Sequence, residues 1–235
     1  MVCVSVILPT FNRAHSLDAA LQSVLAQSFK DFEIIVVDDG STQDIESVIR
    51  AIGDPRLRYI RREANGGAAA ARNTGIAAAN GKFIAFQDSD DQWLPGKLDL
   101  QMRLMKSLAA NVGAVTGAKI LCGGDPKLFN PGKVVIAPDP RSIMTLEEDQ
   151  LGHLLRENRI SVQNALFRRE CYPGNDWFDP CAKANEDWDF AVRLAQHCLI
   201  LEHPEPVVLA FAAAESLSRS NRRQDIGMLR IMRKN

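Results

Sequence analysis

Aspartate side chains occur in two groups, and each group directly follows a stretch that is typical of a buried β-strand. Asp38 and Asp39 follow the first stretch, and Asp88, Asp90 and Asp91 follow the second. If both strands run parallel, their carboxyl ends meet at one edge of a sheet, where five carboxylates would repel one another. A hard divalent cation, Mg²⁺ or Mn²⁺, would offset that repulsion and would also bind phosphate oxygens. The pattern predicts a site for such a cation and a phosphorylated ligand.

Each group taken alone has a simpler interpretation. Aspartate is common in turns, and Asp39-Gly40 is a typical turn pair. The D-x-D pattern of Asp88-Ser89-Asp90 also occurs often by chance. Two such groups at successive strand ends favour the functional interpretation. Because no group of His and Cys residues accompanies the aspartates, zinc is a weaker candidate than Mg²⁺ or Mn²⁺.

Several other nucleotide or hydrolase motifs are missing from the sequence. It has no G-x-x-x-x-G-K-[ST] and no G-x-G-x-x-G after the first strand pattern, and Ser41 does not lie in a G-x-S-x-G motif. These absences argue against a P-loop, a dinucleotide-binding Rossmann domain and an esterase nucleophile elbow.

The first half of the chain alternates between strand and helix patterns. Strand patterns begin near residues 4, 32, 57 and 83, and helical patterns lie between them at 16–25, 45–52 and 67–79. A strand repeat of ~25–30 residues is typical of βαβ units. We therefore expect an α/β fold with a Rossmann-like, mainly parallel sheet and helices on both faces. Such sheets bind ligands beyond the carboxyl ends of their strands, where the aspartates lie.

The second half is less regular. Its periodicity predicts helices at 97–110, 146–155 and 186–196, strands at 112–121 and 161–167, and a long loop at 123–140.

Two more segments have open interpretations. Residues 65–75 either form a small-residue helix that packs closely on the sheet, or open a helix N-terminus toward an anion, with Arg72 facing a phosphate or a base. The acidic cluster at 185–190 either complements a helix dipole or supplies a general base. Trp188 or Trp177 either stacks on a sugar or belongs to the core.

Composition and charge exclude several classes of protein. The chain has 235 residues, of which 46% are hydrophobic and 24% charged, which excludes a disordered chain. Its 28 basic and 29 acidic residues give a net charge of −1, which argues against nucleic-acid binding. We find no signal-peptide pattern and no apolar run of the ~18 residues that span a bilayer. The five cysteines include no C-x-x-C and indicate free thiols in a reducing cytosol, with a Cys171–Cys181 disulfide as the alternative.

Five motifs in order along the chain resemble those of the family 2 glycosyltransferases. They are VSVILPTFNR (4–13), VVDDGS (36–41), NGGAAAARNTGI (65–76), FQDSDDQW (86–93) and NEDWDFAVRLA (185–195). The resemblance implies a GT-A fold with a nucleotide-sugar-binding half at 1–110, an acceptor-binding and catalytic-base half at 111–215, and a basic tail at 216–235. It also implies inverting, metal-dependent transfer from a nucleotide-sugar, with UDP the commonest carrier, to a carbohydrate, lipid-linked or protein acceptor in polysaccharide biosynthesis.

The resemblance also implies roles for individual residues. Asp187 would be the general base that deprotonates the acceptor hydroxyl, and Asp90, with Asp88, would bind Mn²⁺ or Mg²⁺. The residues expected to contact the nucleotide are Pro9, Thr10, Asn12, Asp38, Asp39, Arg72 and Asp88. The candidates on the acceptor side are Glu186, Trp188 and Asp91. The chain lacks the Q-x-x-R-W motif of processive synthases, which argues against a polymer-extruding enzyme.

Two other functions and one location remain open. A non-catalytic nucleotide-sugar-binding protein would share the fold, and a metal-dependent nucleotidyltransferase would share the sheet and the metal. The second normally carries a glycine-rich basic loop after its first strand, where this chain has PTFNRAHS.

We expect a cytoplasmic protein. Its tail at 216–235 has six basic residues against Asp225, and it either contacts the inner face of an anionic membrane or is a solvated terminus.

Overall fold

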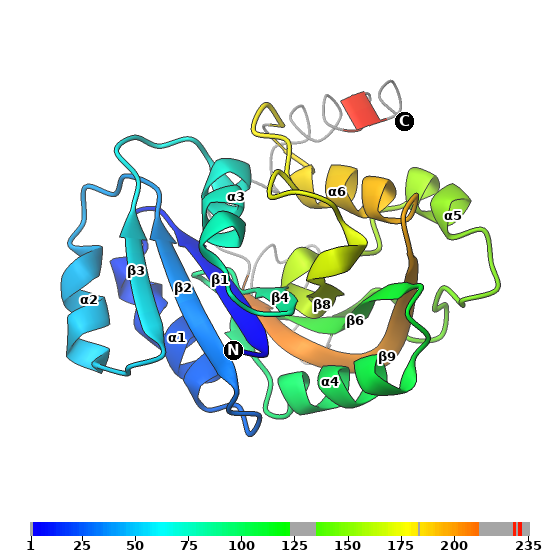
Figure 1. The fold of residues 1–235 in the computed structure, drawn as a ribbon, viewed down its shortest axis with the longest axis horizontal. Coiled ribbons are helices and arrows are strands. Elements are labelled where there is room, and N and C mark those ends of the chain that lie inside the picture. The colour runs from blue at the N-terminus through cyan, green and yellow to red at the C-terminus, as the bar shows by residue number, and fades with distance from the viewer. Residues whose placement is uncertain (1, 123–134, 183, 212–227, 229, 232–235) are drawn as a thin grey trace.

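The computed structural model describes residues 2–122, 135–182, 184–211, 228, 230 and 231. Its first half alternates strands with helices, as the periodicity predicts (Figure 1). The elements are β1 (Val4–Thr10), α1 (Ala14–Leu25), β2 (Phe32–Asp38), α2 (Ile45–Ile52), β3 (Leu57–Arg61), α3 (Ala68–Ala78) and β4 (Phe83–Phe86).

The second half adds strands to the same sheet and three longer helices. Its elements are β5 (Gln92–Trp93), α4 (Lys97–Ser107), β6 (Val112–Cys122), β7 (Val135–Ala137), α5 (Gln150–Arg156), β8 (Ala165–Arg168), α6 (Glu186–Leu194) and β9 (Leu199–Phe211). Two short 3₁₀ helices, η1 (Val162–Asn164) and η2 (Arg169–Cys171), flank β8.

The strands form one sheet in the order β3-β2-β1-β4-β8-β6-β9-β5, with β7 paired to β6. The first four strands are all parallel, and β6 and β9 are also parallel to each other. The pairs of β8 with β4 and with β6 are antiparallel. The order reverses between β1 and β4, and sheets of this kind bind ligands at the carboxyl ends beside such a reversal.

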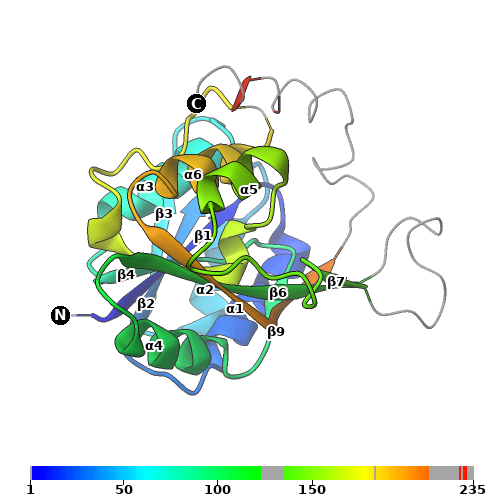
Figure 2. The same ribbon diagram turned by 90° about the vertical axis from the view of Figure 1, so that its right-hand side faces the viewer.

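Helices cover both faces of the sheet. Val6 and Leu8 of β1 pack in one core cluster with residues of α1, α2 and α4, while Ile7 faces a second cluster that includes α3 and α6. This alternation follows from the two-residue period of a strand. The second view shows α5 and α6 together on one side of the sheet and α4 on the other (Figure 2). The α/β fold, the covered sheet and its mainly parallel pairing are confirmed.

Three expectations for the second half were incomplete. Residues 135–137, inside the expected loop 123–140, form β7, while residues 123–134 lie outside the described residues. The expected strand 161–167 divides into η1 and β8. The long strand β9 was not predicted because His203, Pro204 and Pro206 interrupt its apolar pattern. The β6–β9 register shifts around Ala118↔Pro206, and such irregular positions accommodate proline in a sheet.

All five cysteines are among the described residues, and each has a free thiol. None of the helices in the described part of the chain combines the length and apolar character that crossing a membrane requires. Most of the basic tail lies outside the described residues, although Arg230 binds Asp179 with 2.5 Å between Nη2 and Oδ2, and Ile231 is buried.

Close contact between α3 and β1 depends on Gly75. A Cβ atom at this position would overlap Cγ2 of Ile7 and lie 3.2 Å from its Cγ1. We expect Gly75→Ala to lower the free energy of unfolding by ~1–3 kcal/mol, the usual cost of overpacking a core. Urea denaturation measures this loss. Ile7→Ala removes the overlapping atoms, so the double variant should lose less stability than the sum of the two single variants. Additive losses would contradict the proposed contact.

Candidate active site

The two aspartate groups do lie at one edge of the sheet. Thr10 pairs with Asp38 across β1 and β2, and the Asp39 N–H donates to the Thr10 carbonyl at 2.9 Å. On the other side of β1, the Gln87 N–H donates to the Ile7 carbonyl at 3.0 Å. The acidic motif, residues 88–91, therefore begins where β4 ends. The carboxyl ends of β1, β2 and β4 therefore form a common rim.

Asn12 joins the loop after β1 to the loop after β2. Its φ of 52° is in the left-handed region, which asparagine tolerates better than most residues. Its side-chain oxygen accepts hydrogen bonds from the Thr42 N–H at 2.9 Å and the Gln43 N–H at 3.3 Å, and its own N–H donates to the Ser41 hydroxyl at 2.9 Å. The Asn12 side chain thus shapes the rim. Phe11, beside it, is 44% exposed, although sequence reasoning did not single it out.

Asp38 and Asp39 have different surroundings. The Asp38 side chain is completely buried and accepts hydrogen bonds from the Ser41 N–H at 2.8 Å and the Tyr59 hydroxyl at 2.7 Å. Asp39 forms an ion pair with Arg62 and accepts hydrogen bonds from the N–H groups that open α3, at 3.1 Å from Gly66 and 2.7 Å from Gly67. The α3 N-terminus therefore binds an anion, and that anion is the protein's own carboxylate.

Arginines supply much of the positive charge that the rim requires. Asp38 pairs with Arg61 at 3.4 Å and Asp39 with Arg62, while the acidic motif pairs through Arg72–Asp88 at 2.9 Å and Arg13–Asp90 at 3.8 Å. The expectation that something positive lies among the carboxylates thus has these arginines as a partial answer, and the divalent cation stays a prediction. These arginines come from the loop after β1, the end of β3 and the residue after it, and α3, and no spacing in the sequence connects them to their partners.

The acidic motif offers hard oxygen ligands. Burial raises the pKa of Asp90 and the negative charge of Asp88 raises it further, while Arg13 opposes the rise. Its ionised form is therefore disfavoured, and a bound cation would relieve that cost. Two carboxylates fit Mg²⁺ or Mn²⁺, which take one or two protein carboxylates together with phosphate oxygens. Within the described residues, no group of three or more His, Cys, Asp or Glu side chains could hold a metal by itself.

Arg72 connects the acidic motif to α6. Its guanidinium binds Asp88 at 2.9 Å and Glu186 at 2.8 Å, and its side chain is only 6% exposed. Burial lowers the pKa of Arg72, but the two carboxylates outweigh burial and keep the pKa raised, so the group stays charged. The Arg72 Nε atom is buried without a hydrogen-bond partner. The buried Arg72 guanidinium thus joins two half-buried carboxylates that are distant from each other in sequence, Asp88 and Glu186.

Asp187 lies in the first turn of α6, next to Glu186. Its Oδ1 accepts a hydrogen bond from the Trp188 N–H at 2.8 Å and lies 3.5 Å from the Asn158 side-chain nitrogen. Burial raises its pKa to about 6 and the charge of Glu186 adds to the rise, against the lowering effects of Arg72 and Lys119. A carboxylate with this pKa can accept a proton near neutral pH.

Asp91 is buried and tethers β9. Its two oxygens accept hydrogen bonds from the Phe211 N–H at 2.7 Å and the Gln163 side chain at 2.6 Å. Burial raises its pKa to about 7, with Asp88 the next cause. These contacts give Asp91 a clear structural role at the end of β9.

The tryptophans belong to the core, as the simpler interpretation states. Trp188 is 8% exposed and donates from its indole N–H to the Leu154 carbonyl at 2.5 Å. Trp177 is completely buried and stacks on Phe190 with ring centroids 5.4 Å apart. The expectation that Trp188 faces an acceptor is therefore corrected, because its ring packs between α5 and α6.

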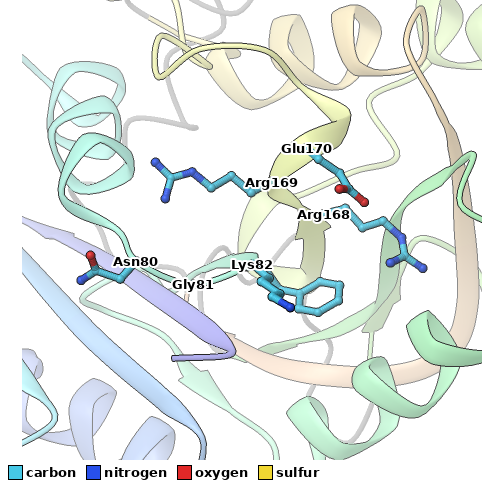
Figure 3. A pocket seen from close by; sticks show the side chains of 7 residues that line it. Asn80, Gly81, Lys82, Arg168, Arg169 and Glu170 are labelled. Atoms are coloured by element: carbon cyan, nitrogen blue, oxygen red, sulfur yellow. The ribbon is translucent and has the colours of Figure 1, made fainter. Parts of the chain in front are cut away.

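A surface groove of about 610 Å³ lies at the opposite end of β4 (Figure 3). It is lined by Asn80, Gly81, Lys82, Phe83, Arg168, Arg169 and Glu170. The side chains of Arg168 and Arg169 point away from each other, and both bind backbone carbonyls elsewhere. Because the groove precedes β4 and the acidic motif follows it, the groove is separate from the candidate site.

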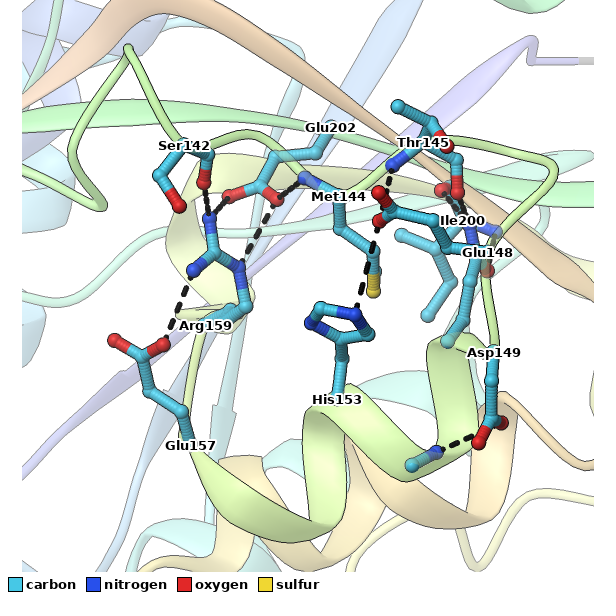
Figure 4. Close-up of polar contacts among 12 residues, drawn as sticks. Ser142, Met144, Thr145, Glu148, Asp149, His153, Glu157, Arg159, Ile200 and Glu202 are labelled. Carbon is cyan, nitrogen blue, oxygen red and sulfur yellow. Dashed lines mark hydrogen bonds and ion pairs between the residues drawn. The ribbon is translucent and has the colours of Figure 1, made fainter.

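A buried ion pair fixes the segment that leads to Asn158. The Arg159 guanidinium binds Glu202 of β9 at 3.1 Å, and Glu202 also accepts a hydrogen bond from the Met144 N–H at 2.6 Å (Figure 4). The Glu157 carboxylate accepts a further hydrogen bond from the guanidinium at 3.1 Å. Removing one partner of a buried pair usually costs ~3–5 kcal/mol, so this segment is firmly held beside α6.

A model of glycosyl transferase family 2 matches residues 5–171. The UDP-Glc:alpha-D-GlcNAc-diphosphoundecaprenol beta-1,3-glucosyltransferase WfgD of Escherichia coli is 40% identical over 102 residues, which are 43% of this chain and 40% of WfgD. The chain therefore spans well under two thirds of that relative.

Two solved structures share the fold. S. aureus TarS 1–349 in complex with UDP-GlcNAc has a TM-score of 0.74 at 21% identity, covering 93% of this chain and 61% of that one. The mannosyltransferase PcManGT from Pyrobaculum calidifontis, in complex with GDP-Man and Mn²⁺, has a TM-score of 0.71 at 22% identity, covering 98% of this chain and 63% of that one. Both are glycosyltransferases of the GT-A type, which confirms the expected fold.

Proposed function

The chain belongs to glycosyl transferase family 2, and from this premise we propose that it is an inverting, metal-dependent glycosyltransferase that uses a nucleotide-sugar. One observation carries the proposal: Arg72 bridges Asp88 of the acidic motif and Glu186, the neighbour of Asp187. The acidic motif proposed to hold the donor and the residue next to the proposed base are thereby joined through one buried guanidinium.

The donor is proposed to be a UDP-sugar bound at the rim of β1, β2 and β4. WfgD is named for UDP-Glc and the TarS structure contains UDP-GlcNAc, whereas PcManGT contains GDP-Man. We assign the base and ribose to Asp39, with Pro9, Thr10 and Asn12 forming the wall around them. The Asp38 side chain is completely buried. We therefore assign it a supporting role, in which it stabilises the turn that positions Asp39.

Asp90, with Asp88, is proposed to hold Mn²⁺ or Mg²⁺. Such an ion supplies Lewis-acid stabilisation of the charge on the leaving nucleoside diphosphate. Arg13 and Arg72 form ion pairs with these carboxylates in the free protein. Their positive charges would remain near the diphosphate when it binds. Arg72 is therefore proposed to contribute charge from behind the acidic motif.

Asp187 is proposed to remove the proton from the acceptor hydroxyl as that oxygen attacks the anomeric carbon. The C–O bond to the diphosphate breaks on the opposite face, so a single displacement inverts the configuration. Glu186 positions the base through Arg72, and Asp91 shapes the acceptor side by tethering β9. The acceptor is proposed to be a carbohydrate, lipid-linked or protein hydroxyl. A cytoplasmic location and a membrane contact of 216–235 remain predictions.

The pKa of Asp187, about 6, predicts a pH profile. Only the deprotonated carboxylate can accept a proton, so turnover should fall as pH decreases through 6 and reach a plateau above it. Below the pKa the rate should decrease ~10-fold per pH unit, as expected for one titrating base. Release of UDP from UDP-glucose between pH 4.5 and 8 measures the profile. A flat rate between pH 5 and 7 would exclude Asp187 as the base.

Product identity separates the candidate functions. We expect free UDP from a UDP-sugar in the presence of Mn²⁺, with inverted anomeric configuration in the sugar product. A nucleotidyltransferase would instead release pyrophosphate, and a non-catalytic binding protein would bind the donor without releasing UDP. Screening UDP-, GDP-, CDP- and dTDP-sugars by thermal shift, with and without Mn²⁺, identifies the donor to use.

A further inference from the structure

Lys119 is a half-buried cation without a carboxylate partner. It lies on β6, and its ammonium donates a hydrogen bond to the Ser161 hydroxyl at 2.6 Å. In the part of the chain that the structure describes, no carboxylate oxygen lies within 4.0 Å of this ammonium. An ammonium has three donors, and a half-buried one with a single neutral partner has unused capacity for an anion.

Lys119 belongs to the surroundings of Asp187. Ser161, its partner, comes three residues after Asn158, whose side chain reaches Asp187 at 3.5 Å. The ion pair of Arg159 with Glu202 holds this segment from within (Figure 4). The positive charge of Lys119 also acts on Asp187 directly, since it lowers the pKa of that carboxyl. The β6 cation and the base thus face the same region.

Other cations near the site differ from Lys119 in one respect. Arg13, Arg72 and Arg159 each bind a carboxylate of the protein, at 3.8, 2.9 and 3.1 Å respectively. Each of these three arginines is thus in an ion pair, whereas Lys119 has no carboxylate of the described residues that close and interacts with Asp187 only at longer range. An anion that enters this region would therefore gain most from contact with Lys119.

The reaction geometry decides which substrate supplies that anion. In an inverting displacement the attacking hydroxyl and the leaving diphosphate lie on opposite faces of the anomeric carbon. The base must contact the hydroxyl, so a cation beside the base faces the acceptor. Resting on the proposed function, we propose that Lys119 binds a phosphoryl group of the acceptor, close to the hydroxyl that receives the sugar.

Phosphoryl groups of this kind occur in two chemical classes, phosphorylated lipids and phosphorylated carbohydrates. Geranyl phosphate and glucose 1-phosphate represent the two, and geraniol and methyl glucoside are their uncharged counterparts. Calorimetry should use the full chain saturated with UDP and Mg²⁺, so that the donor site is filled. We expect one of the two phosphates to bind and its uncharged counterpart to bind at least ~10-fold more weakly, the loss expected for a charge-assisted hydrogen bond.

Variants at position 119 test the residue itself. Lys119→Met should weaken binding of that phosphate at least ~10-fold, and Lys119→Arg should retain most of it, because only the charge is essential. Lys106→Met, at an exposed position of α4, is the matched control and should bind like the wild type.

Three results would overturn the inference: wild-type binding of neither phosphate, equal binding by Lys119→Met, or equal binding of the uncharged counterpart. Titration of UDP with Mg²⁺ and release of UDP from UDP-glucose report on the proposed function separately. If both persist while phosphate binding fails, the acceptor inference is wrong and the proposed function stands. If UDP itself does not bind, the proposed function fails.

Discussion

Replacing Asp187 by asparagine should lower turnover by ~10²–10⁴-fold, the usual contribution of a general base, while leaving donor affinity unchanged. The amide retains the shape of the side chain and its hydrogen bond from the Trp188 N–H, but it cannot accept the proton of the acceptor hydroxyl. UDP release measures turnover, and calorimetry with UDP-glucose and Mn²⁺ measures donor affinity.

The same substitution has an expected effect on stability. The pKa of Asp187 is about 6 in the folded protein and ~3.9 in an unfolded chain, so the folded state favours the protonated form. Wild-type stability therefore decreases as pH rises from ~4 through 6, and the uncharged amide avoids that cost. The variant should be more stable than the wild type at pH 8, and the difference should vanish near pH 4.

Asp176→Asn, at an exposed position, is the control and should change neither property. Two outcomes would argue against a base at position 187. One is a loss of donor affinity in Asp187→Asn as large as the loss of turnover. The other is turnover within a few fold of the wild type.

Replacing Asp90 by asparagine should abolish the effect of metal on nucleotide binding. The amide has no negative charge to hold Mn²⁺ or Mg²⁺, and the variant keeps the neighbouring residues of the rim. We expect wild-type affinity for UDP to rise on addition of Mn²⁺, and the affinity of Asp90→Asn to stay at the metal-free value. Turnover should then fall to the level of the wild type in EDTA.

Calorimetric titrations with UDP, in the presence of Mn²⁺ and in the presence of EDTA, measure the affinity of the wild type and of the variant. Asp18→Asn, on the exposed side of α1, provides a control with the same chemical change. If Asp90→Asn bound UDP with an undiminished response to Mn²⁺, the assignment of the metal to this motif would be wrong. A stability measurement on the same samples excludes unfolding as the cause.

Strand ends were the most predictable part of the site. The buried strand patterns before Asp38 and Asp88 can be recognised in the sequence without any knowledge of tertiary contacts. Parallel pairing of these strands with β1 then brings their carboxyl ends to one rim. Gly75 was likewise predictable as a close-packing residue of α3, because a helix rich in small residues can approach a sheet closely. Local pattern and simple topology were sufficient here.

Contacts between distant residues were not predictable. Asp39 accepts hydrogen bonds from the glycines that open α3, and Arg72 reaches Glu186 across 114 positions of sequence. Tryptophan is a residue type that can stack on a sugar. Only the packing of Trp188 against Leu154 shows that it belongs to the core. Lys119 has no motif around it, and its relation to Asp187 arises from the fold of residues 158–161.

A crystal structure of the chain with UDP and Mn²⁺, with the ion located by the anomalous scattering of manganese, tests the proposed site most directly. We predict one ion bound at Asp90 together with the diphosphate, uracil beside Asp39, and Asp187 facing the space beyond the β-phosphate where the sugar would lie. Manganese or UDP bound away from this rim, for example in the groove beside Lys82, would contradict this prediction.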